Sequence, residues 1–404
     1  MFDESRRRVR EELQRLEIDA CLVTTPANIF YTIGFYSPVV NLSFRLMGTD
    51  MALIPADPSL SAALMTSDFA APAARAATSI EDIRAYRMWV ENRDLDIITG
   101  RSGSDARISR PPQWNPDELD ETLTSMLEER GLSAATVGID LRYVYADSLF
   151  RLQQNNPECQ FVDVTGMLYG LRAIKHPQEI GMHRNAAKLF EAGLRRAINE
   201  AREGQSAQDI KYQYQAGALE AAMADPALGE FQSAYGFISA GTGSSFGDRS
   251  GLRSGDLIKF DCGVAVGGFY SDCGRTFAFG RASGEQRRVH DALAEAHAAA
   301  REQMRPGTPI SAVYRAADEV MQARGFPGYS RGHYGHSIGL DTFVEEPPFI
   351  SATEHSELQP GMLLCLEAPY YSASLGSYQI EDMILITETG HENFNTLSYE
   401  LVEL

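Results

Sequence analysis

The chain has 404 residues, and its 55 Asp and Glu outnumber its 36 Lys and Arg, which gives a formal net charge of −19. This acidic excess would repel nucleic acid and anionic membrane surfaces, so it argues against both as partners. Five scattered cysteines are too few for a disulfide framework. Hydrophobic residues at 44% are ordinary for a globular protein, and the length suits two domains.

The sequence also predicts where the protein resides. Its first residues, MFDESRRRVREELQRLEIDACLV, carry charges where a signal peptide needs an apolar run. No stretch reaches the roughly 18 apolar residues of a membrane span. We therefore expect a cytoplasmic protein without membrane contact.

Strands and helices alternate in the first part of the chain, residues 1–168. Apolar residues at helical spacing predict helices at 3–17, 118–130 and 148–155. Short apolar runs predict strands at 20–23, 50–55, 62–66, 136–140 and 160–164. A loop is expected at 24–28 and a surface excursion at about 90–116. The alternation predicts an α/β domain.

The pattern changes in the second part, residues 169–404. A helix pair is expected at 177–203 and 206–224, followed by a strand-rich block at 236–280. A second helix pair is expected at 284–305 and 310–324, followed by a second strand-rich block at 332–404. A helix pair followed by a strand-rich block thus occurs twice. This repetition predicts an α+β domain with internal pseudo-symmetry.

The segment LIKFDCGVAVGGFYSDCGRTFAF, Leu257–Phe279, indicates two strands around a Gly267–Gly268 turn. A hairpin centred near Val266–Gly267 places Asp261 directly opposite Asp272, and opposed residues have Cβ atoms about 4.5–5.5 Å apart. Two carboxylates so close repel each other, and the pKa of one of them rises unless a cation lies between them. The pattern favours a metal site, with two solvated strand aspartates as the alternative.

Two later segments carry further ligand types. In RGHYGHSIGLDTFVEEPP, His336 lies among glycines that let the backbone approach whatever the imidazole binds, although a hydrogen-bonded loop histidine is the alternative. In LLCLEAPYYSASLGSYQIEDMILITETG, Glu367 and Glu381 end apolar runs, and the segment has no Lys or Arg to pair with them. Burying a carboxylate without a partner is costly. Two Asp, one His and two Glu form a ligand set that can hold a pair of divalent ions.

The order of these residues resembles the pita-bread metallopeptidases, a family that includes methionine aminopeptidase, aminopeptidase P, prolidase and the metal-free creatinase. The matching stretches are Asp261 followed by SDCGRT, then GHSIGL, LEAP and IEDMILITETG. The two-domain layout resembles creatinase and prolidase. The resemblance implies a creatinase-like N-terminal α/β domain over 1–168 and a pita-bread catalytic domain over 169–404, in which two helix pairs pack on a curved antiparallel sheet.

The same resemblance implies a metal centre. One or two divalent ions (Mn, Fe, Co or Zn) would be held by five residues: Asp261, Asp272, His336, Glu367 and Glu381. Asp272 and Glu381 would bridge two ions, and Glu367 would also accept and pass on protons. A homodimer is implied as well, with the loop around Arg45 near the active site of the partner subunit.

Histidines that bind the scissile carbonyl and the oxyanion in the family are missing from all three expected positions. The loop before Asp261, SAGTGSSFGDRSGLRSGD, has no His, and Gly332 stands four residues before His336. Phe343 stands seven residues after that histidine, and Gln379 replaces an expected Arg. Losing a single oxyanion donor typically costs about 10²–10³ in rate. The sequence therefore predicts a relative adapted to another small molecule.

We accordingly expect a metal-dependent hydrolase that cleaves a C–N amide-type bond in a small molecule, similar to Xaa-Pro dipeptidase but not a standard prolidase. Asp248, His333 and Tyr334 are the candidate substitute polar groups. Phe343 would form an aromatic wall that favours an apolar or cationic group near the metal. Two alternatives remain: a metal-dependent lyase of the dimethylsulfoniopropionate-lyase type and a non-catalytic pita-bread binding protein.

Overall fold

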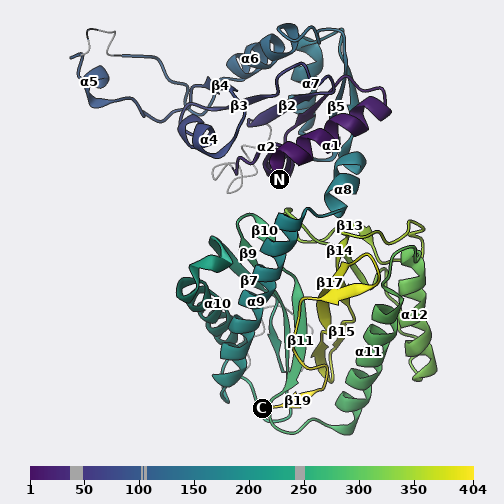
Figure 1. Ribbon diagram of the computed structural model, residues 1–404. Helices are drawn as coiled ribbons and strands as arrows, with labels where there is room; N and C mark the ends of the chain where they lie inside the picture. Colours follow the sequence, from purple (N-terminus) through teal and green to yellow (C-terminus); the bar gives the residue numbers. More distant parts are fainter. Residues whose placement is uncertain (37–48, 102, 104–106, 242–250) are drawn as a thin grey trace. The chain divides into compact units, whose positions relative to one another are not determined.

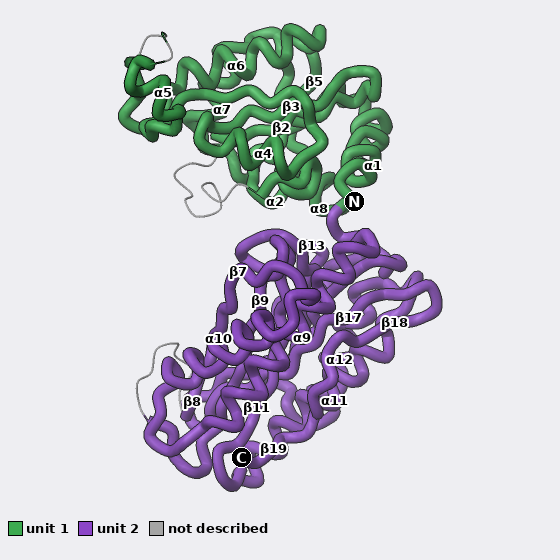
Figure 2. The backbone as a smooth tube through the Cα atoms, turned by 60° about the vertical axis from the view of Figure 1, so that its left-hand side comes forward, with its two compact units in different colours: residues 1–171 green, residues 172–404 purple. Residues whose placement is uncertain are grey.

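The computed structural model describes residues 1–36, 49–101, 103, 107–241 and 251–404. Arg45 and Asp248 lie outside the described residues, so the expectations for them stay predictions. The chain divides into two compact units, Met1–Leu171 and Arg172–Leu404 (Figure 2). None of the described helices is both long and apolar enough to cross a membrane.

Unit 1 is an α/β domain whose described residues form a six-stranded mixed sheet in the order β4-β3-β2-β1-β5-β6 (Figure 1). Its strands are β1 (Ala20–Val23), β2 (Met51–Pro55), β3 (Ala63–Ser67), β4 (Asp82–Tyr86), β5 (Thr136–Ile139) and β6 (Gln160–Asp163). Its helices are α1 (Phe2–Arg15), α2 (Pro26–Ile33), α4 (Ala71–Ala77), α5 (Leu95–Ile98), α6 (Pro116–Glu128), α7 (Ala146–Asn155) and α8 (Thr165–Ala173), which crosses the boundary of the units. The five strands expected from the sequence are confirmed.

Helix α2 occupies most of the segment that was expected to be a loop, 24–28. The Thr25 side chain accepts a hydrogen bond from the Asn28 amide, and Pro26 takes the first helical position. Both features stabilise a helix start. The loop prediction was wrong because eight helical residues are too few to show a periodic apolar face.

Unit 2 contains both expected helix pairs, α9 (Pro177–Asn199) with α10 (Ala207–Ala224) and α11 (Gly284–Gln303) with α12 (Ile310–Ala323). Its described residues form a curved, mainly antiparallel sheet of eleven strands in the order β10-β9-β11-β17-β14-β12-β13, with β7 and β8 on β9, β18 on β17 and β19 on β11 (Figure 1). The bounds are β7 (Phe231–Gly236), β8 (Ser239–Ala240), β9 (Leu257–Val266), β10 (Phe269–Tyr270), β11 (Cys273–Ala278), β12 (Gly335–Ser337), β13 (Glu346–Phe349), β14 (Leu363–Glu367), β17 (Glu381–Ile386), β18 (His391–Asn393) and β19 (Val402–Glu403). A separate hairpin pairs β15 (Tyr370–Ser372) with β16 (Gly376–Tyr378).

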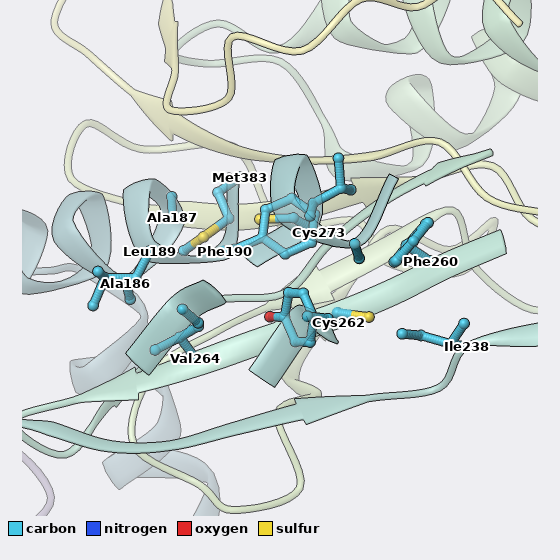
Figure 3. Packing of buried hydrophobic residues seen from close by; sticks show 14 of the residues in the cluster. Ala186, Ala187, Leu189, Phe190, Ile238, Phe260, Cys262, Val264, Cys273 and Met383 are labelled. Carbon is cyan, nitrogen blue, oxygen red and sulfur yellow. The ribbon is translucent and has the colours of Figure 1, made fainter. Parts of the chain in front are cut away.

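Each helix pair packs against a different part of this sheet. Phe190 of α9 and Phe260 of β9 lie in one buried cluster (Figure 3). The same cluster contains Tyr214 of α10. Leu293 of α11 lies in a second cluster with Leu364 of β14. Burying such side chains stabilises the fold by about 1.5–3 kcal/mol each. The two helix pairs therefore stabilise different parts of the same sheet.

Candidate metal centre

The strand register places three acidic residues in one row across four neighbouring strands. Asp261 on β9 pairs with Gly274 on β11, and Gly274 pairs with Glu381 on β17. Glu381 in turn pairs with Glu367 on β14. Directly paired residues of neighbouring strands share a face. The carboxylates of this row therefore project on one side of the sheet. The side chain of Gln379 fills the space beside Gly274, where a Cβ would lie 2.1 Å from the Gln379 Cγ.

The hairpin that carries the two aspartates has a different register from the one expected. Gly267 and Gly268 have φ of 56° and 90°, which are type I′ turn values, so the turn is centred on both glycines. Asp261 consequently pairs with Gly274, and the prediction that Asp272 lies directly opposite was wrong. Asp272 lies two positions along the chain from Gly274. The Asp272 side chain nevertheless reaches the same place, because carboxylate oxygens of Asp261, Asp272 and Glu381 lie within 4.8 Å of one another.

His336, on β12, lies close to the carboxylates of Asp272 and Glu381. Its Nδ1 lies 3.0 Å from the backbone oxygen of Ser337. Its Nε2 lies 3.9 Å from Asp272 Oδ2 and 3.9 Å from Glu381 Oε1. When Nδ1–H donates to the carbonyl, Nε2 directs a lone pair at the carboxylates, which is the tautomer of a metal-ligating histidine.

Two carboxylates of the group are in an electrostatically costly position. Burial and the neighbouring carboxylates raise the pKa of Asp272 and of Glu381 well above the ordinary values. Asp272 Oδ1 is buried without a hydrogen-bond partner in the described part of the chain. A divalent cation would satisfy this acceptor and offset the repulsion. The residues present therefore fit a divalent ion with oxygen ligands and one imidazole.

Glu367 has a cationic partner that lies outside its own segment. Arg331 Nη2 lies 2.8 Å from Glu367 Oε1. Gln379 Nε2 donates to Glu367 Oε2 at 3.2 Å and to Glu381 Oε2 at 2.9 Å. Burial alone would raise the pKa of Glu367, but the neighbouring positive charges, that of Arg331 first, outweigh it and lower the pKa. Glu367 is therefore ionised at neutral pH.

A second cation, Lys259, contacts the other end of the row. It precedes Asp261 by two positions on β9, so the two side chains share a face. Lys259 is fully buried, and its Nζ lies 2.8 Å from Asp261 Oδ2. Burial disfavours the ammonium, but the charge of Asp261 outweighs burial, and the pKa of Lys259 is raised. The sequence offered a signal for this contact, because a lysine inside the apolar run LIKF needs a partner.

Cys365 lies beside the centre, next to His336 and Glu381. Its sulfur lies within 4.8 Å of ligand atoms of His336 and Glu381. Burial and the neighbouring carboxylates of Glu381 and Asp272 raise the pKa of the thiol well above its ordinary value.

The remaining candidates from the sequence separate into two groups. His333 reaches the site, with Nδ1 3.3 Å from Glu367 Oε1. Tyr334 does not, because its ring lies in the α11–α12 core cluster and its hydroxyl has no hydrogen-bond partner among the described residues. Phe343 forms no buried wall. It is 71% exposed, because its neighbour Val344 takes the place in the core.

The opposite face of the same strands carries a separate polar network. Arg275 Nη2 lies 2.6 Å from Asp382 Oδ1, and both residues are buried. Arg275 Nη1 donates to the backbone oxygens of Gly274 and Glu381 at 2.8 and 2.9 Å. Burial acts to raise the pKa of Asp382, but Arg275 outweighs it and the pKa is lowered. This network fixes the backbone of the acidic row from behind.

A curved sheet with four carboxylates and one imidazole on one face defines the class of metal-dependent pita-bread enzymes. A family model described as "Metallopeptidase family M24" matches residues 181–388, and one described as "Creatinase/Prolidase N-terminal domain" matches residues 6–174. The chain therefore belongs to metallopeptidase family M24, and it carries a creatinase-type N-terminal domain. The predicted α+β fold and family are confirmed.

Individual relatives extend over almost the whole chain. "Uncharacterized peptidase MW1651" of Staphylococcus aureus (strain MW2) is 25% identical over 389 residues, 95% of this chain and 97% of that protein. The Xaa-Pro dipeptidase from Bacillus anthracis superimposes with a TM-score of 0.81 at 19% identity and covers 100% of both chains. The prolidase from Pyrococcus horikoshii OT3 gives 0.78 at 21% identity over 99% of this chain and 100% of that one.

These likenesses separate the functional alternatives. The two structures share the fold with this chain, and the family is one of metallopeptidases. The protein is therefore a metallohydrolase. The lyase and the non-catalytic binding protein, which the sequence left as alternatives, are not favoured.

Proposed function

We propose that this protein hydrolyses a C–N amide-type bond in a small molecule and differs from a standard prolidase in its substrate. The observation that carries the proposal is the acidic row itself. Its carboxylates meet His336, while the positions of the peptidase histidines hold other residues. The chain thus combines a ligand set for hydrolysis with different surroundings for the substrate.

The proposed ligands are Asp261, Asp272, His336, Glu367 and Glu381. The ion is one of Mn, Fe, Co and Zn, and Mn is our first choice because the set is rich in oxygen. A bound divalent ion supplies Lewis acidity, which polarises a carbonyl and makes water a better nucleophile at neutral pH. Elemental analysis of the purified protein tests the identity of the ion.

The proton transfers are proposed for Glu367 with His333 beside it. Arg331 keeps the Glu367 carboxylate ionised, so it can accept the proton of the attacking water. His333 lies 3.3 Å from that carboxylate and is partly exposed, a position from which it can pass the proton to the leaving nitrogen. Asp248 remains a further candidate from the sequence.

The surroundings of the row lack a cation that is available to a substrate carboxylate among the described residues. Arg331 is paired with Glu367, and Lys259 is paired with Asp261. Gln379, where the family has Arg, uses its Nε2 on ligand carboxylates and leaves its Oε1 without a partner. A buried amide oxygen accepts hydrogen bonds and repels a carboxylate. A substrate that presents an N–H group here fits better than a free C-terminal proline.

A substrate panel tests this proposal. The Mn-loaded protein is assayed on Gly-Pro and Ala-Pro, and in parallel on N-acyl amino acids, dipeptide amides and cyclic imides. We expect hydrolysis in the second group and only weak turnover of the proline dipeptides. Turnover of Gly-Pro near the typical enzyme median of about 10 s⁻¹ would refute the proposed specificity. Gln379→Arg, which restores a cation, should raise proline-dipeptide hydrolysis.

The oligomeric state and location are proposed on the family resemblance. We propose a cytoplasmic homodimer in which the loop around Arg45 lies near the active site of the partner subunit. Analytical ultracentrifugation of the active protein is the direct test. A stable monomer with full activity would exclude the dimer.

A further inference from the structure

We infer that unit 1 contains a binding site of its own, a cavity that takes a small, uncharged aromatic molecule with an amide-type polar group. The cavity has a volume of about 290 Å³ and lies between the sheet, α6 and α7. A cavity of roughly 150 Å³ already holds benzene. Its described lining residues belong to unit 1 and the acidic row belongs to unit 2, so the inference goes beyond the proposed function.

The topology of the sheet in unit 1 supports a binding site at this place. β1 and β5 are parallel neighbours, and the chain continues from β1 to β2 on one side and from β5 to β6 on the other. Ligands of open α/β sheets bind where the strand order reverses in this way, beyond the carboxyl ends of the strands. The cavity lies at that point, because its lining includes Thr24, which follows β1, and Ile139, the last residue of β5.

Hydrogen bonds hold the carboxyl ends of these two strands in place. Asp140 follows β5, is buried, and accepts hydrogen bonds from the backbone N–H groups of Thr24 and Thr25 at 3.1 Å each. It also accepts from the Thr24 hydroxyl at 2.6 Å and from the Asn28 side chain at 2.9 Å. This side of the cavity is therefore formed before a ligand binds, and a preformed site lowers the cost of binding.

The inner part of the cavity is apolar. Met65, Leu123 and Ile139 line it, and each is at most 3% exposed. Trp114 and Tyr143 add two aromatic rings to the lining. Aromatic side chains and methionine sulfur both make favourable contacts with a further ring. This part of the cavity therefore fits an aromatic ring.

The outer part of the cavity carries charged side chains and one donor without a partner. Arg151 lines the cavity, and its Nη2 donates to Asp117 at 2.8 Å and to Asp120. Its Nε is buried and has no hydrogen-bond partner in the described part of the chain, so a ligand oxygen can accept from it. An anion would be repelled by Asp120 and Asp147, which also line the cavity, and a cation offers no acceptor. An uncharged amide suits both, because its carbonyl accepts and its N–H donates.

Tryptophan fluorescence tests the inference, because the sequence has two tryptophans, Trp89 and Trp114, and both lie in unit 1. In the Trp89→Phe variant of the full-length protein, stripped of metal with a chelator, the signal comes from Trp114 alone. Benzamide is the probe, and we expect a saturable change with a Kd of about 1 mM or lower. Benzoate and benzylammonium, which are similar in size but charged, should bind at least about 10-fold more weakly.

Two variants locate the probe in the cavity. Ser148→Phe fills part of the cavity from α7 and should weaken benzamide binding by at least about 10-fold, as for other loss of a fitted ring contact. Gln154→Phe, at an exposed position of α7 outside the lining, is its control and should keep the parental Kd. Arg151→Met keeps the apolar stem but removes the donor and should weaken binding about 10-fold. Arg142→Met, exposed and outside the lining, is the matched control.

The absence of a saturable signal with benzamide in the folded protein would overturn the inference. Stronger binding of benzoate or benzylammonium, or parental affinity in Ser148→Phe, would also overturn it. If circular dichroism shows that a variant is unfolded, the order of the three probes in the Trp89→Phe protein decides. Addition of Mn²⁺ should leave the Kd unchanged, and a Kd that required Mn²⁺ would overturn the inference by placing the probe at the metal centre.

Discussion

The two faces of strands β11 and β17 both bury acidic side chains, and they do so in opposite ways. On one face Asp382 lies against Arg275, and the pKa of this carboxyl is lowered. On the other face Asp272 and Glu381 lie among further carboxylates, and their pKa values are raised. Glu381 and Asp382 are adjacent on β17, yet the charge of Asp382 is compensated by Arg275 while Glu381 lies among other carboxylates.

The difference separates a carboxylate whose charge the protein compensates from one whose charge it leaves uncompensated. Asp382 also accepts hydrogen bonds from Tyr399 and Asn393, so its charge is fully compensated. Asp272 Oδ1 has no partner in the described part of the chain. A folded protein retains such an uncompensated group when something else binds there.

The largest expected effect comes from Asp272→Asn on the site face. Even residues that only orient a metal ligand typically cost 10–100-fold in affinity or activity, so loss of a ligand should lower amide hydrolysis by at least about 100-fold. Bound metal should fall as well, as measured by elemental analysis. In the chelated protein the same change should raise the free energy of unfolding, on the order of 1 kcal/mol, because it removes a repelled carboxylate. If urea unfolding showed the chelated variant to be less stable than its parent, Asp272 would not be a repelled carboxylate in the folded protein.

The same chemical change on the other face, Asp382→Asn, should act in the reverse way. It leaves Arg275 buried without its counter-charge, and breaking a buried ion pair costs about 3–5 kcal/mol. We expect urea unfolding at a correspondingly lower midpoint, with an unchanged metal content per folded chain. A variant of parental stability would show that the Arg275–Asp382 pair is not structural.

Arg331→Gln should have a smaller effect and a specific signature. Without Arg331 the pKa of Glu367 rises, so the acidic limb of the pH–rate profile should move to higher pH. We expect kcat to fall by about 10–100-fold with little change in KM, as for other groups that position a metal ligand. Arg331→Lys should recover part of the loss. An unmoved acidic limb would rule out this role for Arg331.

The family and the fold could be predicted from the sequence, because the type and spacing of the motif residues carry that information; the five ligand candidates stay predictions. The partner of Glu367 could not be predicted. Arg331 contacts Glu367 across 36 positions of chain, and no local pattern links two segments so far apart. The segment around Glu367, residues 363–390, contains no Lys or Arg, so its own sequence does not indicate the partner.

Backbone geometry explains the other differences. Strand alternation places Tyr334 on the same face as His336, but Gly335 between them has φ of +138° and breaks the alternation. A side chain at Gly335 would come within 1.9 Å of the Cys365 oxygen, so the tight approach needs glycine. Such a conformation cannot be read from apolar spacing, and Tyr334 is buried in the core as a result.

The smallest expected effect concerns the pH dependence of the network around Asp382. His297 is buried, with Nε2 3.1 Å from the Leu366 oxygen and 3.7 Å from Asp382 Oδ2. Burial lowers the pKa of His297 to about 4. An unfolded histidine has a pKa of about 6.5, so between these values only the unfolded chain binds the proton. The free energy of unfolding therefore falls as the pH falls below 6.5.

One unit of pKa difference corresponds to about 1.36 kcal/mol, so this histidine should cost about 2 kcal/mol of stability between pH 6.5 and 5. Urea unfolding of the chelated protein at several pH values measures the slope. His297→Gln, which cannot be protonated, should make the stability less dependent on pH in this range, with His355→Gln at an exposed position as the control for loss of an imidazole. If His297→Gln kept the parental slope, His297 would have to be charged in the folded protein. Asp382 would then share its charge between Arg275 and an imidazolium, and the two faces of the sheet would differ less than their geometry indicates.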